Sequence, residues 1–308
     1  MSSTGTQLPA AIAGGDAFGG TRADVHRTPP PARRRRPTRV LVWLAAAITA
    51  VLLTYPFLWL VSASLKPRSQ VFDNRLWPRD FRFQNYAEVW AEAPILRWLM
   101  NSVVVGLAAA TTVTLSSAFI AFGFSYFRFR GRDALFGLVL ATMMLPGVVT
   151  MVPTYLVWNE LGLATTQVPL WGMNLFGSAI YIFLLRQFFL NLPRELFEAA
   201  RVDGVGYLGL FWRIAVPLSK PALIITFILE LRASWTDLVR PLIYLQDAAL
   251  FTLPRGLKVV LDQFGQGGEL KWEVVLAASV IATVPMVIAF FLGQRYFVQG
   301  IATTGRKG

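Results

Sequence analysis

NLPRELFEAARVDGVGYLGLFWRIAVPLSKP, residues 191–221, is a stretch of mixed polarity between two strongly apolar runs. It contains acids, bases and glycines, whereas the chain as a whole is 55% hydrophobic and only 15% charged. About a quarter of the residues in an average soluble domain are charged. The composition therefore favours an integral membrane protein, in which this stretch forms a structured loop at one membrane face.

Several kinds of chemistry are disfavoured by residues that the chain lacks. The 308-residue sequence has no cysteine, which excludes disulfides, thiolate metal sites and a cysteine nucleophile. Its one histidine, His26, lies in an N-terminal tail without apolar periodicity, so imidazole catalysis is not expected in the folded part. No phosphate-cradling G-x-x-x-x-G-K-S/T pattern occurs, so we expect another chain to hydrolyse any ATP that is used. We therefore expect no enzymatic activity, no metal and no cofactor.

The net charge of +12 would be compatible with a nucleic-acid partner. The arginines, however, gather at residues 33–36 of the tail and at the ends of apolar runs. That distribution is typical of topology signals and of contact with anionic lipid, so we expect no nucleic acid. Residues 1–39 are interpreted as a disordered basic tail on the cytoplasmic side.

Six apolar runs predict six membrane-spanning helices, because about 20 residues are needed to cross the bilayer core. The runs are residues 40–64, 101–127, 134–158, 168–190, 219–235 and 273–297. Basic clusters precede the first run and follow the second and fourth, so the positive-inside rule predicts that both termini are cytoplasmic. The predicted fold class is all-α, a polytopic membrane domain over residues 40–308. Within it, 191–221 is a cytoplasmic loop and 246–272 an external one.

Two of these runs are interrupted. Pro146-Gly147 and Pro153 break the third, which indicates either a kinked packing helix or the wall of a transport pathway. Charged residues leave the end of the fifth run open, and an extended or re-entrant segment at 230–250 would change the topology.

Local signals within 191–221 predict two short helices. Pro193 suits a first helical turn, and Gly204 can adopt the left-handed conformation that ends a helix. The first helix is therefore predicted to end at Asp203-Gly204. Residues at helical spacing give it one common face, formed by Leu196, Ala199, Ala200 and Asp203. The second helix is predicted over residues 207–214, with Val216-Pro217 breaking it.

An amphipathic loop lying in the membrane interface would share these features, and the residues themselves leave that alternative open. Their spacing, however, resembles the signature of bacterial ABC-importer permeases, in which a cytoplasmic loop reads E-A-A, three residues, G, and later I-x-x-P. The matching residues are Glu198, Ala199, Ala200, Gly204, Ile214 and Pro217. Other stretches resemble the carbohydrate-uptake, maltose-type branch, and the shorter of its two paralogous permease subunits. These are NS at 101–102, LPG at 145–147, LLRQFF at 184–189, PLIY at 241–244 and FVQG at 297–300.

The resemblance implies a function and a set of partners. It implies that 191–221 is a coupling loop that docks on a separate ATPase, with Glu198 as the charged contact, the two alanines as the close-packing face and Gly204 as the bend. It also implies a multi-pass protein of the bacterial cytoplasmic membrane that pairs with a paralogous permease, two ATPase chains and an external solute-binding protein. Residues 246–272 resemble the family loop that reaches into the binding protein, and a flexible connector is the alternative.

Charged residues in or near the fifth run are the remaining signal, because ionisable groups within a membrane are functional candidates. Glu230, Trp235 and Asp237 are candidates for a substrate pathway. The alternative is that Glu230 pairs with a basic neighbour, that Trp235 packs, and that Asp237 and Arg240 sit at the outer interface. Glu230, Arg232 and Arg240 also depart from the more apolar helix of the resembled family.

Other solutes and another class of protein stay open. Polyol and glycerol-phosphate importers belong to the same branch. An ion-driven secondary transporter would need a paired inverted repeat and a midplane carboxylate, and no clear repeat is found.

Overall fold

The computed structural model describes residues 36–73, 75–265 and 268–304, and this part contains helices and turns but no strand. The chain divides into two units, Met1–Leu53 and Thr54–Gly308. What is described of the first unit is the start of α1 (Arg36–Ser64), whose side chains from Val40 to Leu53 are exposed. Residues Val40–Ser64 are long and apolar enough to cross a membrane, as predicted for the first run. The tail prediction falls almost entirely on residues 1–35, outside the described part.

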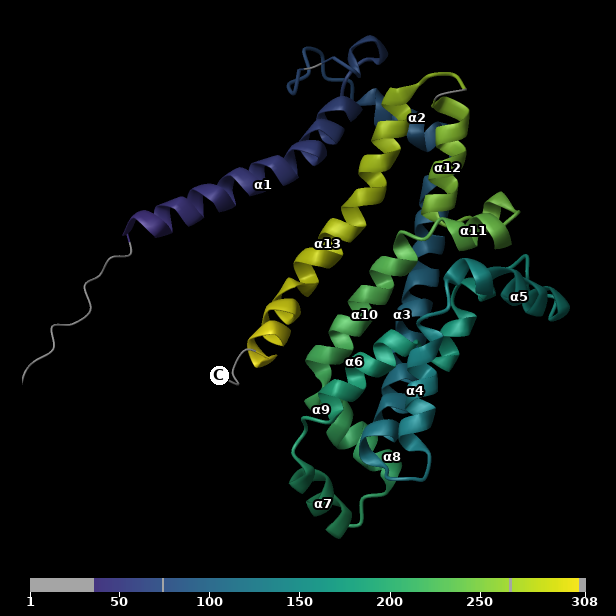
Figure 1. Ribbon diagram of the computed structural model, residues 1–308. Helices are drawn as coiled ribbons and strands as arrows, with labels where there is room; N and C mark the ends of the chain where they lie inside the picture. The colour runs from purple at the N-terminus through teal and green to yellow at the C-terminus, as the bar shows by residue number, and fades with distance from the viewer. Residues whose placement is uncertain (1–35, 74, 266–267, 305–308) are drawn as a thin grey trace, which may run out of the picture. The chain divides into compact units, whose positions relative to one another are not determined.

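The second unit is built around α3 (Ile95–Tyr126), which packs against α10 (Lys220–Trp235) and α6 (Ala179–Phe189) (Figure 1). α10 packs in turn against α13 (Trp272–Thr304). Several α3 positions that face these neighbours are small and fully buried: Ala109, Ala110, Ala118 and Ala121. Small side chains let helix backbones approach closely, which is how helices associate in lipid. The predicted second run is thus confirmed as a helix, beginning at Ile95 rather than Asn101.

The third apolar run is not one helix. It forms α4 (Arg132–Thr142) and α5 (Gly147–Glu160), which meet at an angle of 97°. Pro146 explains the break, since a proline lacks the N–H of a helical bond and disfavours helical geometry at the residue before it. Pro153, by contrast, is accommodated inside α5.

The fourth apolar run also departs from a regular helix. Its first half forms short 3₁₀ turns, η2 (Val168–Leu170) and η3 (Gly172–Phe176), before α6 begins. Gly177 ends η3 with φ +78°, and a Cβ there would lie 3.0 Å from the Ile120 Cδ1 atom and 3.3 Å from the Ser117 Oγ atom of α3. The irregular backbone is held by α3, because the Ser117 hydroxyl accepts the Ser178 N–H at 3.0 Å.

The fifth and sixth runs form α10 and α13, and the segment between them is largely helical. It contains α11 (Val239–Tyr244), η5 (Ala248–Leu250) and α12 (Leu253–Phe264). α12 lies close against the indole of Trp98, since a Cβ on Gly256 would fall 2.0 Å from its Cε3 atom. A packed helix therefore replaces the flexible connector over most of this segment, although residues 266–267 of its glycine-rich part lie outside the described residues.

The segment between α1 and α3 is folded around a buried lysine. It contains η1 (Arg68–Gln70) and α2 (Gln84–Glu92). Lys66 is fully buried, and its ammonium group donates to the carboxylate of Asp73 and to the carbonyl of Arg75. This hydrogen bond from Lys66 holds the pKa of Asp73 below its ordinary value.

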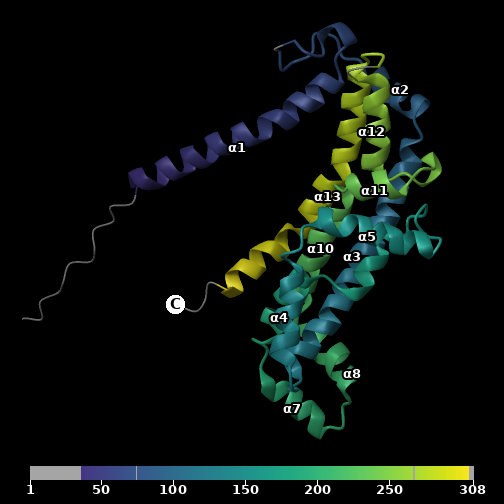
Figure 2. The ribbon, with the colours of Figure 1, turned by 45° about the vertical axis from the view of Figure 1, so that its right-hand side comes forward.

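By length and composition, three helices could each cross a membrane, or up to six spans result if each bent pair is counted as one. α2 and α12 lie at one end of the second unit, and α7 (Arg194–Val202) and α8 (Tyr207–Leu210) lie at the other, as both views show (Figures 1 and 2).

Candidate functional site

The first helix of the 191–221 loop has the bounds that its sequence predicts. α7 follows Pro193 and ends at Asp203, and Gly204 has φ +81°. The Gly204 N–H bonds the Arg201 carbonyl at 3.1 Å, and the Val205 N–H bonds the Ala200 carbonyl at 2.9 Å. This pair of bonds is the Schellman arrangement, in which a left-handed residue closes a helix. The guanidinium of Arg201 also lies over the ring of Tyr207, 4.5 Å from its centroid, and so joins α7 to α8 across the turn.

The predicted break at Val216-Pro217 is wrong. α8 continues through η4 (Phe211–Ala215), a π-helix, into α9 (Val216–Leu218), and the chain bends by 80° only after Leu218. A π-helical turn is wider than an α-helical one and can re-satisfy backbone groups that a proline frees, so Pro217 fits at the start of α9. Ile214 is half-buried on this continuous helix, while Pro217 is exposed.

One aromatic side chain anchors α7 to the rest of the unit. Within α7, all of whose residues are described, only Phe197 is buried. Its ring lies 5.6 Å from that of Tyr126 and 6.3 Å from that of Phe122, both on the last turns of α3. Phe211 of η4 joins the same cluster, 5.5 Å from Phe122. Sequence reasoning missed Phe197, although the aromatic residues at the end of the second run were a signal for such an anchor.

The face predicted for close packing is mostly open. Leu196, Ala199 and Asp203 are exposed, and Ala200 is half-buried against the cluster under the loop. Val202 is 88% exposed. Such an exposed apolar side chain extends the surface that a partner could cover.

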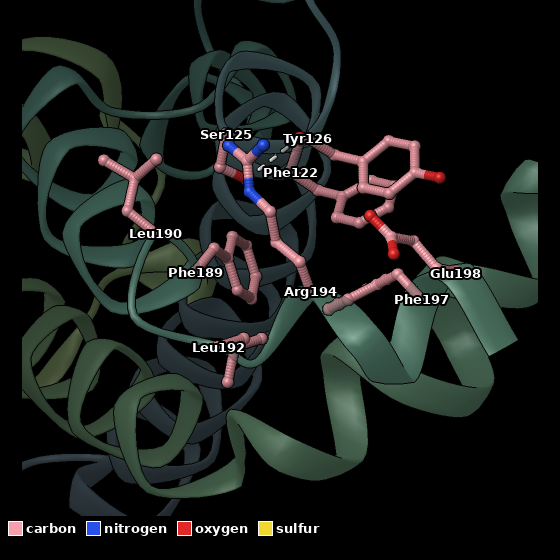
Figure 3. A pocket seen from close by; sticks show the side chains of 9 residues that line it. All are labelled: Phe122, Ser125, Tyr126, Phe189, Leu190, Leu192, Arg194, Phe197 and Glu198. Atoms are coloured by element: carbon pink, nitrogen blue, oxygen red, sulfur yellow. Dashed lines mark hydrogen bonds between the residues drawn. The ribbon is translucent and has the colours of Figure 1, made fainter. Parts of the chain in front are cut away.

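A cavity of about 200 Å³ lies between α7 and the ends of α3 and α6 (Figure 3). Its wall combines aromatic side chains with Ser125, Arg194 and Glu198. Figure 3 shows the Arg194 side chain reaching towards Ser125, while the Glu198 carboxylate lies on the Tyr126 side. Arg194 and Glu198 are one helical turn apart, yet no carboxylate–guanidinium pair within 4.0 Å joins them in the described structure. Glu198 is exposed and has no ion-pair partner among the described residues.

Glu230 is buried in the middle of the unit, with 9% of its surface exposed. Its carboxylate accepts a hydrogen bond from the Asn174 amide at 2.8 Å, and the same amide donates to the Ala109 carbonyl of α3 at 3.1 Å. The Ser116 hydroxyl donates to the Asn174 carbonyl at 2.7 Å. The basic partner weighed for Glu230 is not found among the described residues, where an amide takes that place. Sequence reasoning missed Asn174, which lies in the run expected to be a plain helix.

Trp235 and Asp237 make contacts that differ from those of Glu230. Trp235 is 7% exposed, and its indole N–H donates to the Ala282 carbonyl of α13 at 3.3 Å. Asp237 forms an ion pair with Arg240, whose guanidinium also donates to the Leu170 carbonyl at 3.1 Å. These contacts favour packing and structural pairing over substrate contact for both residues.

A bundle of apolar and partly broken helices is compatible with a membrane transport protein, in which broken helices often line the pathway. Comparison with known proteins gives the family. Residues 102–303 match the family described as binding-protein-dependent transport system inner membrane component, and the chain belongs to it.

Named relatives align with most of the chain. A probable ABC transporter permease protein, YurM of Bacillus subtilis, is 34% identical over 87% of this chain and 88% of its own length. The arabinooligosaccharides transport system permease protein AraQ of the same organism is 33% identical over 88% and 96%. The sn-glycerol-3-phosphate permease protein UgpE of Yersinia pestis is 33% identical over 87% and 97%.

A solved structure has the same fold. A chain from the crystal structure of a bacterial ABC transporter that imports the acidic polysaccharide alginate matches with a TM-score of 0.76 and 24% identity, over 88% of this chain and 100% of that one. Another, from an alginate transporter in complex with its pentasaccharide-bound periplasmic protein, matches with a TM-score of 0.59 and 14% identity, over 83% and 93%. These likenesses establish the ABC-importer permease fold.

Proposed function

We propose that the chain is the permease subunit of an ATP-driven carbohydrate importer and forms half of its translocation pathway. Residues 191–221 are the loop that couples this pathway to a separate ATPase. The observation that carries the proposal is that α7 has one buried and one exposed side. Phe197 packs against the rest of the unit, whereas Leu196, Glu198 and Ala199 are exposed. A loop that merely rests in the membrane interface has no need of a buried aromatic anchor opposite an unpaired carboxylate.

The anchor determines how force would pass through the loop. When the ATPase chains close, a docked α7 moves with them, and the aromatic contacts carry this movement to α3. Rigid-body motion of packed helices is the usual form of such a transition. Glu198 serves as the charged contact to a basic group of the ATPase, the exposed alanine allows close approach, and Gly204 sets the angle between α7 and α8.

The membrane arrangement follows from the same reading. Three long helices and the apolar parts of three bent pairs support six spans, with both termini and the 191–221 loop on the cytoplasmic side of a bacterial cytoplasmic membrane. Two of these pairs include α7 and α8, so their membrane parts are 172–189 and 220–235. A paralogous permease, two ATPase chains and an external solute-binding protein complete the importer. The structural neighbour crystallised with a periplasmic protein supports the last of these partners.

A carbohydrate is the favoured solute because relatives and neighbours are named for arabinooligosaccharides and alginate. The relative named for sn-glycerol-3-phosphate supports a second candidate, a polyol or a glycerol-phosphate-type solute. Titration of the cognate external binding protein with members of both classes distinguishes the two.

Charge reversal at Glu198 tests the coupling role. In proteoliposomes that contain the complete importer, Glu198→Lys is expected to abolish ATP-dependent uptake while the variant still inserts and assembles. Glu195→Lys is the matched control, since it makes the same charge change at another exposed position of α7 and should keep most of the uptake.

Uptake at the wild-type rate by Glu198→Lys would refute the coupling role, and equal loss in both variants would refute the specific role of Glu198.

The energy source of uptake is tested in a separate experiment. Uptake that survives an ionophore at constant ATP supports the importer, whereas uptake that collapses supports an ion-driven secondary transporter.

A further inference from the structure

A second cavity, of about 530 Å³, lies where the connection between α3 and α4, the start of α4, the end of α6 and the start of α7 meet. Three arginines line it: Arg128 of the connection, Arg132 at the start of α4 and Arg194 at the start of α7. Arg194 and Leu190 also line the first cavity, so the two cavities share a wall. The second cavity takes no part in the coupling contacts described above.

The charge of this cavity is only partly balanced by the chain. Asp133 is the single acidic residue of its wall, and it pairs with the Nε atom of Arg132 at 3.0 Å while its side chain stays 81% exposed. Among the described residues, Arg128 and Arg194 have no carboxylate within 4.0 Å. Positive charges around one cavity stabilise an anion that binds within it. The first turn of α4 adds backbone N–H groups that lack helical partners.

Exposed apolar residues adjoin the basic wall. Phe129 and Leu190, which line the cavity, are each 44% exposed. Leu135 and Leu138 follow on α4, three residues apart and therefore on one side of the helix, with exposed fractions of 50% and 64%. A free phosphate ion would make no apolar contacts with this surface, whereas the acyl chains of a lipid would cover it.

We propose that this cavity binds the phosphate headgroup of an acidic phospholipid, whose acyl chains lie along Leu135 and Leu138. The proposal rests on the membrane placement argued under the proposed function, in which the cavity faces the cytoplasmic leaflet. Basic pockets between transmembrane helices on that side are suited to anionic headgroups. Because Arg194 is the first residue of α7, a bound headgroup also restrains the start of the coupling helix.

The test is direct binding to the full-length chain purified in detergent, followed by native mass spectrometry. The probes are dioleoylphosphatidylglycerol, dioleoylphosphatidylcholine and inorganic phosphate. Phosphatidylglycerol is expected to bind the wild type, and Arg128→Gln/Arg132→Gln to weaken this binding about thirtyfold. That figure follows from about 1 kcal/mol for each arginine near an acidic surface, with tenfold for every 1.4 kcal/mol. The measurement needs no transport, so its failure is distinguishable from failure of the proposed function.

Arg130→Gln is the matched control, because Arg130 is exposed in the same turn but does not line the cavity. It should change the affinity less than about twofold, as expected of a screened surface charge. Arg128→Lys/Arg132→Lys keeps the charge and should recover most of the binding. Thermal unfolding of each variant verifies that the fold is intact.

Several results would overturn the proposal. Equal weakening by Arg130→Gln would reduce the effect to diffuse positive charge. Equal binding of phosphatidylcholine would remove the role of headgroup charge, and equal binding of inorganic phosphate would assign the cavity to a soluble anion. Unchanged lipid binding by Arg128→Gln/Arg132→Gln, together with weakened assembly with the ATPase, would assign these arginines to a protein partner.

Discussion

Truncation of the aromatic anchor, Phe197→Ala, should release α7 from the rest of the protein without unfolding the membrane domain. Replacing a buried phenylalanine by alanine costs about 3–5 kcal/mol, because transfer free energy and contacts around the new void are both lost. Phe197 is 7% exposed and already lines a cavity of about 200 Å³ on one side. We therefore expect the lower end of that range, about 3 kcal/mol.

Hydrogen exchange followed by mass spectrometry measures this loss where it occurs. Because Phe197 is the buried side chain of α7, the free energy of local opening falls by nearly the whole amount. Since 1.4 kcal/mol is a factor of ten, amides of α7 should exchange about a hundredfold faster. Exchange in α13, which lies outside the aromatic cluster, should not change. Leu196→Ala is the control, as Leu196 is the neighbouring residue but is 46% exposed. Exchange in α7 that is the same in both variants would refute the anchor.

Two further changes test particular contacts. Gly204→Ala places a side chain on a residue with φ +81°, which costs about 1–2 kcal/mol, so it should lower both thermal stability and coupled uptake. Gly206→Ala is the control, because Gly206 has φ −70° and open space around its Cβ position, and it should alter neither quantity. Equal effects of the two variants would refute the role of the turn. Glu230→Leu removes one of the two acceptors of the Asn174 amide, which keeps only the Ala109 carbonyl, and should destabilise the protein by about 1–3 kcal/mol in thermal unfolding. Glu230→Gln retains an acceptor oxygen and should keep wild-type stability and uptake, and a stable Gln variant that has lost uptake would instead assign the carboxylate to the substrate.

The elements that could be predicted from sequence are those determined by local chemistry. α7 begins after Pro193 and ends at Gly204 because proline and glycine restrict or free their own backbone torsions. The break at Pro146 follows from the same local rule, although its angle of 97° does not. The prediction that Pro217 breaks the helix is wrong because the π-helix before it accommodates the proline ring.

Contacts between distant residues could not be predicted in this way. Asn174 reaches Glu230 only because the chain between Val168 and Phe176 forms short 3₁₀ turns, and no periodicity in the sequence indicates them. The sequence pointed to Glu230 by its charge in an apolar run but not to its partner. Phe197 lies beside the predicted face of α7, and only the position of α3 makes it the buried residue.

α3 is the element that connects the loop to the opposite end of the unit. At one end, Tyr126 and Phe122 contact Phe197 of α7. At the other end, the Asn101 amide donates to the carbonyls of residues 249 and 251, both at 2.9 Å, in the segment that precedes α12. A helix of 32 residues is about 48 Å long, enough to reach from one face of a membrane to the other. Because both sets of contacts are made by one helix, a displacement of α7 by a docked ATPase would reach the segment before α12 without passing through a loop. The proposed coupling therefore depends on the stiffness of α3 as much as on the residues of the 191–221 loop.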